Sequence, residues 1–214
     1  MLSREPTLDA PEIERVAEPA AAPQAERLAV PTAAAAPAVA IPFAKLVAED
    51  LAANTERSGF RGGVHAFLTE PAFACVLLHR LACKARSAGF GVLARMLWRM
   101  NVWSSSCHIH LEAVVGRAVR LPHPTGIVVG KGARIGHSVT LYQNVTLGRG
   151  LKDERYPVIE DEVVIFPNSV VVGGITIGAR AVIGAGSVVI ADVPADSIVT
   201  GNPAKLLRMR SHDS

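Results

Sequence analysis

The chain has 214 residues, of which half are apolar and 5% are aromatic, and its formal net charge is +3. This length fits one or two domains with a core of their own. No run of like charge is long enough to suggest a tail that binds nucleic acid. The three cysteines fit neither a disulfide framework nor a zinc-binding spacing. We predict a cytoplasmic protein without a transmembrane segment, because prolines interrupt its longest uncharged run, over 28–44.

Residues 1–42 form a compositional unit of their own. They contain thirteen alanines and seven prolines and no aromatic residue. Frequent proline prevents a long helix, and alanine buries too little surface to offset the entropy lost on ordering. The composition predicts a disordered extension, with a short docking motif around residues 13–16 as the alternative.

The pattern from 43 to 106 predicts a small helical domain. An apolar stripe begins at Phe43, and Pro71 is placed to open a further helix at its first turn. The glycines of 57–63 indicate a loop between these two helices. A third stripe over 92–100, together with Trp98, predicts core or interface residues.

A six-residue repeat dominates the chain after Cys107. Every sixth residue from Val129 to Val189 is Ile, Val or Leu, with Asp153 as the one exception. This period is typical of a hexapeptide parallel β-helix, in which three short faces make one triangular coil of about 18 residues. The aliphatic position points inward, and the coils stack at the spacing of neighbouring strands. We expect a β-helix over 107–205 and a short basic tail over 206–214.

The repeat is broken in two places. Leu121 and Val129 are eight residues apart instead of six, and the extra residues surround His123. The second break is the polar segment 149–157, which we expect to leave the prism as a loop. Solenoids usually place functional insertions on one face, so both breaks are candidate site segments.

The chain resembles the serine acetyltransferases and their relatives in exopolysaccharide gene clusters. The likeness covers about residues 43–207. It rests on the order of the helical domain, the His-containing break, the loop and a Gly-Asn-Pro-Ala end, through the following motifs: His108-Ile-His-Leu, Pro122-His-Pro-Thr-Gly-Ile-Val-Val-Gly130, Gln143-Asn-Val-Thr-Leu-Gly148, Ile183-Gly-Ala-Gly-Ser-Val-Val189 and Gly201-Asn-Pro-Ala-Lys205. The resemblance implies a left-handed β-helix and an O-acetyltransferase that uses acetyl-CoA and no metal.

His123 matches the family's catalytic histidine. Acetylation of a hydroxyl requires that its proton be removed as the oxygen attacks the thioester, and a neutral imidazole suits that task. The alternative is a surface histidine in a proline-rich turn.

His108 stands where the family has an aspartate that orients the base. A neutral histidine there accepts a hydrogen bond but supplies no negative charge. His110 matches a family histidine near the site and is equally open to a structural role.

Other site residues follow from the resemblance alone. Arg155 matches the arginine of a pair that holds the carboxylate of serine, while Tyr156 replaces the histidine of that pair. On the donor side, Gly148 matches a backbone amide beside the thioester. Candidates for the acetyl-CoA site further along the chain are Pro167, Ala185 and Lys205.

The acceptor stays open between L-serine and a sugar hydroxyl. The family's carboxylates for the serine ammonium are missing, because Pro122 and His108 replace two of them and 55–59 lacks an Asp-Pro pair. Nine Arg or Lys residues against two Glu over 57–120 would also repel an ammonium and attract an acidic saccharide. Overall resemblance favours L-serine, and these charges favour the saccharide slightly. A non-catalytic hexapeptide scaffold is the third alternative.

The resemblance also implies a homotrimer or a dimer of trimers, with sites between subunits. Outward apolar positions, such as Tyr142, Phe166 and Val172, are expected to meet neighbouring prisms.

Many serine acetyltransferases bind a sulfhydrylase through a long tail that ends in isoleucine. Here only eleven residues follow Pro203 and their end is polar, so we expect no stable sulfhydrylase complex.

Overall fold

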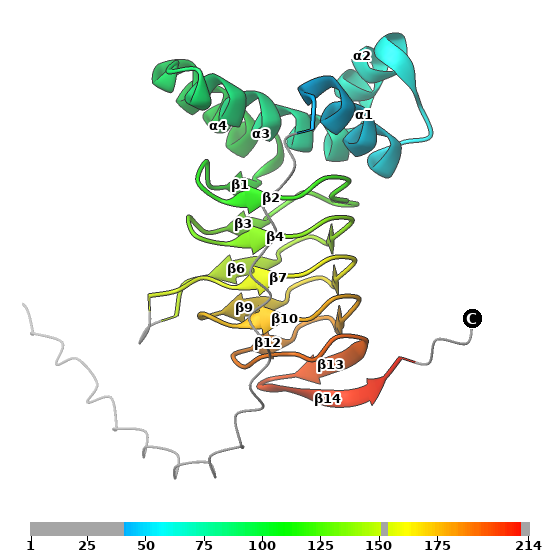
Figure 1. The fold of residues 1–214 in the computed structure, drawn as a ribbon, viewed down its shortest axis with the longest axis vertical. Coiled ribbons are helices and arrows are strands. Elements are labelled where there is room, and N and C mark those ends of the chain that lie inside the picture. Colours follow the sequence, from blue (N-terminus) through cyan, green and yellow to red (C-terminus); the bar gives the residue numbers. More distant parts are fainter. Residues whose placement is uncertain (1–40, 151–153, 211–214) are drawn as a thin grey trace, which may run out of the picture. The chain divides into compact units, whose positions relative to one another are not determined.

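The computed structural model describes residues 41–150 and 154–210. Within these ranges the chain forms four helices followed by a stack of short strands (Figure 1). The helices are α1 (Phe43–Asn54), α2 (Gly59–Thr69), α3 (Pro71–Ser87) and α4 (Gly91–Ser105). They lie together at one end of the stack (Figure 1). The disordered extension predicted for 1–42 falls almost wholly outside the described residues.

Helix α2 corrects the loop expected over 57–63. Gly62 and Gly63 lie inside this helix, and a Cβ at Gly62 would stand 3.2 Å from the Cβ of Arg57. A Cβ at Gly63 would contact Leu51 of α1 at 3.8 Å. Gly62 therefore lets α2 approach the preceding segment closely, whereas the distance at Gly63 is an ordinary van der Waals contact; both glycines are helical despite their low helix propensity.

The apolar stripe of α4 is largely exposed rather than buried in a core. Ala94 is buried, but Val92 and Met96 are 76% and 63% exposed. The role of this stripe in an interface, the other role that the sequence allowed, therefore stays a prediction. In the described part of the chain no single helix is long and apolar enough to cross a membrane; α2 and α3 pass such a test only as a pair bent by 107°.

The strands form three faces of a prism, and each face takes one strand from each successive coil. Face 1 contains β1 (His108–Ile109), β3 (Val128–Val129), β6 (Thr146–Gly148), β9 (Val170–Val172) and β12 (Val188–Val189). Face 2 contains β2 (Val114–Val115), β4 (Arg134–Ile135), β7 (Val158–Ile159) and β10 (Thr176–Ile177). Face 3 contains β5 (Thr140–Leu141), β8 (Val164–Ile165), β11 (Val182–Ile183), β13 (Ser197–Gly201) and β14 (Ala204–Met209).

The six-residue aliphatic repeat forms the core of this prism. On face 1 the parallel register joins Val129 to Leu147, Leu147 to Val171 and Val171 to Val189. All four side chains are at most 2% exposed, as are most inward residues of the other faces. The predicted helical domain and left-handed parallel β-helix are therefore confirmed. Asp153, the exception in the repeat, lies outside the described residues.

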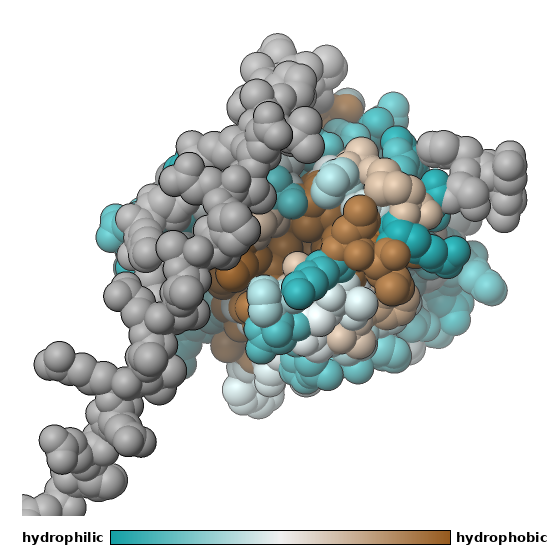
Figure 2. Space-filling model, turned by 90° about the horizontal axis from the view of Figure 1, so that it is seen from below, coloured by the Kyte–Doolittle hydropathy of each residue, from teal (hydrophilic) through white to brown (hydrophobic). Residues whose placement is uncertain are grey.

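The end of the β-helix differs from the expected tail. Residues up to Met209 belong to β14, which pairs antiparallel with β13. Leu206 opposes Val199 in this ladder, so the chain stays on face 3 for longer than the basic composition indicated. Leu206, Leu207 and Met209 are exposed on β14, and Figure 2, which views this end of the molecule, shows hydrophobic side chains gathered there.

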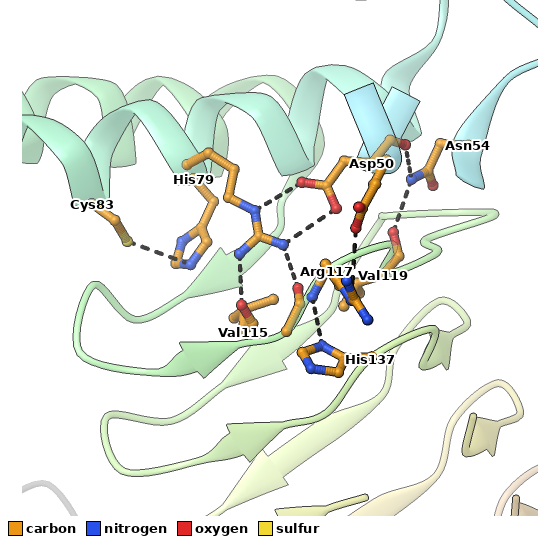
Figure 3. A network of polar contacts seen from close by, with 11 residues as sticks. Asp50, Asn54, His79, Cys83, Val115, Arg117, Val119 and His137 are labelled. Carbon is orange, nitrogen blue, oxygen red and sulfur yellow. Dashed lines mark hydrogen bonds and ion pairs between the residues drawn. The ribbon is translucent and has the colours of Figure 1, made fainter. Parts of the chain in front are cut away.

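A buried ion pair joins the helical domain to the first coil (Figure 3). Arg80 of α3 donates from Nε to Asp50 Oδ2 of α1 at 2.9 Å, and the two side chains are 7% and 1% exposed. The same guanidinium donates to the carbonyl oxygens of Val115, at 2.7 Å, and Gly116. Each guanidinium nitrogen thus donates to a carboxylate or a carbonyl oxygen, and these bonds connect α1 and α3 to the end of β2.

His79, beside this pair on α3, should make stability depend on pH. Burial, and secondarily the charge of Arg80, lowers the pKa of His79 from 6.5 to about 3. Between pH 3 and 6.5, the unfolded chain therefore binds one proton more at His79 than the folded protein does. The free energy of unfolding should fall by about 1.4 kcal/mol per pH unit as the pH drops from 6.5 towards 3.

Urea unfolding of the wild type and of His79→Leu across this pH range measures the contribution of His79. The variant should show a shallower loss of stability with acidification. Equal slopes for the two proteins would contradict a neutral, buried His79 as the cause.

Candidate active site

A cavity of about 590 Å³ that is open to solvent lies between the register break and the helical domain. His123 lines it together with residues from the ends of α1 and α4 and from the junction of α2 with α3. The lining residues are Ala53, Asn54, Glu70, Pro71, Ala72, Ser104, Ser105, Arg120, Pro122, His123, Pro124 and Thr125. A volume of this size suits a small-molecule ligand.

Local hydrogen bonds hold the loop that carries His123. The Gly126 N–H donates to the carbonyl of Ser106 at the end of α4, and the Asn144 N–H donates to the carbonyl of Thr125, at 3.2 and 3.0 Å. Gly126 has φ +71, and a Cβ there would overlap the Asn144 side chain. Glycine is therefore required at this turn, which fixes the far end of the loop.

Asn54 fixes the near end of the same loop. Its Nδ2 donates to the Val119 carbonyl at 2.8 Å, and its Oδ1 accepts from the Leu121 N–H at 3.1 Å. Val119 and Leu121 are buried, whereas Arg120 between them is exposed. The C-terminal residue of α1 thus sets the backbone from which both Arg120 and His123 extend.

His123 lies at the turn from face 3 to face 1, which we call the base edge. Its ring is 6.4 Å from that of Tyr142 on the next coil, and Tyr142 stacks on Phe166 of the coil after at 5.1 Å. Pro167 and Ala185 occupy the turns of later coils on the same edge, where the Gly186 N–H donates to the Pro167 carbonyl. Lys205 is exposed on β14 of face 3.

Gly148, Arg155 and Tyr156 lie at the turn from face 1 to face 2, which we call the loop edge. Gly148 ends β6 there, and Arg155 accepts through its carbonyl from the Gly150 N–H at 3.1 Å. The Tyr156 ring covers Gly130 and Gly132, where any side chain would overlap it. Face 1 therefore separates these residues from His123 within one chain.

The two other candidate histidines lie on β1 and at its end. His108 is on face 1 with its ring edge-on to Trp98 at 4.8 Å, and no hydrogen bond joins it to His123 among the described residues. His110 is on the loop edge, where its Nδ1 accepts from the Glu112 N–H at 3.1 Å. Burial lowers the pKa of His110, which favours the neutral imidazole seen as an acceptor here.

Sequence reasoning missed Glu70 as a site residue. It lines the His123 cavity, although it lies far from the break in sequence and matches no motif. Its position before Pro71 indicated only a helix start; the α2–α3 bend that brings it to the cavity is a tertiary feature.

The described ranges contain no group of three or more His, Cys, Asp or Glu residues that could hold a metal ion.

The chain matches known proteins over most of its length. A family model described as bacterial transferase hexapeptide (six repeats) matches residues 156–191. Serine acetyltransferase of Bacillus pumilus is 34% identical over 168 residues, 77% of each chain, and that of Bacillus subtilis is 37% identical over 65% of each. Soybean serine acetyltransferase complexed with serine superposes with a TM-score of 0.69 at 34% identity, covering 77% of this chain and 69% of that one. The Brucella abortus enzyme in complex with coenzyme A gives 0.70 at 30% identity, covering 79% and 69%.

The helical domain, the hexapeptide β-helix and a histidine in a cavity at the register break together define a hexapeptide-repeat acyltransferase. Because the relatives match at this identity and coverage, the chain belongs to the serine acetyltransferase family. It is an O-acetyltransferase, as the sequence predicted.

Proposed function

We propose that the protein transfers acetyl from acetyl-CoA to the hydroxyl of L-serine, with His123 as general base. The observation that carries this proposal is the placement of His123 in a cavity at the register break. The loop is held at both ends by Asn54 and Asn144, so the imidazole extends from a fixed backbone. Rigid support of this kind is what a base needs to meet its substrate in one geometry.

The reaction balances with one base. The His123 imidazole accepts the hydroxyl proton while the serine oxygen attacks the thioester carbonyl, which gives a tetrahedral intermediate. This intermediate collapses by breaking the C–S bond, and the imidazolium returns its proton to the leaving CoA thiolate. The products are O-acetylserine and CoA, with no change of oxidation state. A general base of this type contributes about 10²- to 10⁴-fold to the rate.

The slight preference for a saccharide acceptor is not supported. The similar proteins reported above are serine acetyltransferases. Three of the basic residues over 57–120 are also neutralised by acids: Arg80 pairs with Asp50, Arg86 with Glu112 and Arg117 with Glu49. In addition, Glu70 lines the cavity, so the site is not lined by basic residues alone.

The split of candidate residues between two edges supports a site shared by neighbouring subunits. His123, Pro167 and Ala185 follow the base edge, whereas Gly148 and Arg155 lie on the loop edge of the same prism. A three-fold arrangement of prisms would bring the base edge of one subunit to the loop edge of the next. We therefore place acetyl-CoA between subunits, with Lys205 near its phosphates and the Gly148 N–H beside the thioester carbonyl.

A trimer should form through the aromatic pair on the base edge. Tyr142 and Phe166 are stacked outside the prism, and Phe166 is 37% exposed. Light scattering at micromolar concentration should give the mass of three or six chains, and Phe166→Glu should shift it towards monomer with loss of acetyl transfer. A wild type that is monomeric and fully active would contradict the shared site.

The acceptor is tested by CoA-thiol release with L-serine against a panel of neutral and acidic oligosaccharides. L-Serine should give saturable turnover, with a kcat/KM well above that of any saccharide. Turnover of a saccharide in preference to L-serine would contradict the proposal.

A further inference from the structure

Two of the three cysteines lie far apart in the sequence but meet in the core of the structure. Cys75 is on α3, and Cys107 stands between the C-cap of α4 and β1. They are 1% and 0% exposed, and both belong to the apolar cluster that continues into the prism. Their side chains are hydrogen-bonded to each other, and both are free thiols. Two thiols in direct contact are the arrangement from which a disulfide forms.

The last turn of α4 sets the surroundings of Cys75. Asn101 Nδ2 donates to the Cys75 carbonyl at 3.1 Å, and the side chains of Asn101 and Ser105 also hydrogen-bond the thiol. The hydrogen bond from Cys107 lowers the pKa of Cys75 against the opposing effect of burial, and Asn101 and Ser105 add to this lowering. The same bond, together with burial, raises the pKa of Cys107. Because the thiolate is the reactive form, Cys75 is the cysteine of the pair that reacts first.

A second, smaller cavity reaches Cys75. Its volume is about 190 Å³, and it lies beside the His123 cavity, with which it shares Glu70 and Ser105 among the lining residues. Cys75 lines this cavity, and Cys107 is not among its lining residues. A water molecule takes about 30 Å³ of liquid volume, so the space admits an oxidant as small as hydrogen peroxide. Cys75 is therefore open to attack on a peroxide, with Cys107 in contact with it to complete a disulfide.

We propose that Cys75 and Cys107 form a modification site, which a peroxide converts to a disulfide that lowers acetyl transfer. The Cys75 thiolate attacks one peroxide oxygen and the O–O bond breaks, so the sulfur becomes a sulfenic acid while the released hydroxide takes up a proton. Cys107 then attacks this sulfur, the S–O bond breaks, and the Cys107 proton leaves with the oxygen as water. One hydrogen peroxide and two thiols thus give one disulfide and two waters. A dithiol reverses the change by thiol–disulfide exchange.

The disulfide should act on the His123 loop through the residue before Cys107. Bonded sulfurs lie about 2.0 Å apart, closer than two hydrogen-bonded thiols, so the segments that carry Cys75 and Cys107 must move towards each other. The preceding residue, Ser106, accepts the bond from the Gly126 N–H that holds the far end of the loop. Oxidation should therefore displace this anchor. The disulfide itself does not depend on the proposed function, whereas its effect on acetyl transfer rests on His123 as the base.

Mass spectrometry of the wild type treated with hydrogen peroxide tests the disulfide without an activity measurement. The oxidised protein should lose the mass of two hydrogen atoms, and a protease digest without reductant should contain a cross-linked peptide that joins Cys75 to Cys107. Dithiothreitol should restore the original mass. A digest in which Cys75 is converted to sulfinic acid instead, or in which Cys83 takes the place of Cys107 in the cross-link, would overturn the pairing.

CoA release before and after the same treatment measures the effect on acetyl transfer. Oxidation of the wild type should lower kcat about 10- to 100-fold, because small displacements of a catalytic group have effects of this size. Cys75→Ala and Cys107→Ala should both lose this response. Cys83→Ala is the matched control and should respond as the wild type does, since Cys83 lies on the same helix with its Sγ 3.6 Å from His79 Nε2 (Figure 3).

The outcomes separate this inference from the proposed function. A reduced wild type that does not acetylate L-serine contradicts the proposed function, and the cross-link is then still read from the digest. A wild type that forms the cross-link with undiminished CoA release contradicts the effect on the His123 loop. Peroxide treatment that lowers activity equally in the wild type and Cys75→Ala would show that another group is oxidised. If an alanine variant does not fold, as thermal melting reveals, the digest of the wild type decides the pairing.

Discussion

Replacing His123 by alanine should lower kcat for acetyl transfer by about 10²- to 10⁴-fold, the contribution of a general base. The loss should fall on kcat more than on the KM for acetyl-CoA, because the imidazole acts on the hydroxyl of the acceptor. The loop itself should keep its conformation, since its anchors are the backbone bonds to Asn54 and Asn144. Stopped-time assays of CoA release at saturating donor measure the effect.

His65→Ala is the matched control for this experiment. His65 is exposed on α2, where its Nδ1 is 3.1 Å from the Thr69 hydroxyl, and it does not line the cavity. Its loss should leave kcat unchanged. His108→Ala reports on the orienting role implied by the resemblance. A large fall in kcat for His108→Ala with little change for His123→Ala would exchange the roles of the two residues.

Breaking the buried Asp50–Arg80 pair should cause a large loss of stability. Asp50→Ala leaves the Arg80 guanidinium, 7% exposed, without its counter-charge. Removal of one partner from a buried ion pair costs about 3–5 kcal/mol. Because Arg80 also donates to Val115 and Gly116, the contact between the helices and the first coil should loosen, and activity should fall with stability. Urea unfolding at one fixed protein concentration measures the change.

The neighbouring pair Glu49–Arg117 provides the control. Its atoms are 3.7 Å apart and its side chains are 27% and 44% exposed, so Glu49→Gln should cost less than about 1 kcal/mol. Replacement of both buried partners, Asp50→Leu with Arg80→Met, should restore part of the stability lost in Asp50→Ala. Equal effects of Asp50→Ala and Glu49→Gln would show that the buried pair does not hold the helices to the coil.

The β-helix was predictable because one inward residue per six is a strong and local signal. A residue such as Val129 or Ile183 is buried by its own coil and the two beside it, whatever the helical domain does. The break at His123 was predictable for the same reason, since two extra residues disturb a regular count. The ladder of β14 on β13 was not, because Leu206 and Arg208 follow no such period.

The helical domain depended on contacts that no local pattern records. Gly62 and Gly63 indicated a loop, yet both lie inside α2, where Gly62 approaches Arg57 closely. The bend between α2 and α3 then brings Glu70 to His123, although more than fifty residues separate them in sequence. The motifs around His123 therefore gave no signal for a carboxylate residue that the fold brings to the cavity from the helical domain.

Product analysis by mass spectrometry tests the central claim most directly. Incubated with acetyl-CoA and L-serine, the wild type should form O-acetyl-L-serine in equal amount to the CoA released, and His123→Ala should form almost none. Release of CoA at the same rate with and without L-serine, with no acetylated serine, would contradict the claim that the His123 cavity is a serine acetylation site.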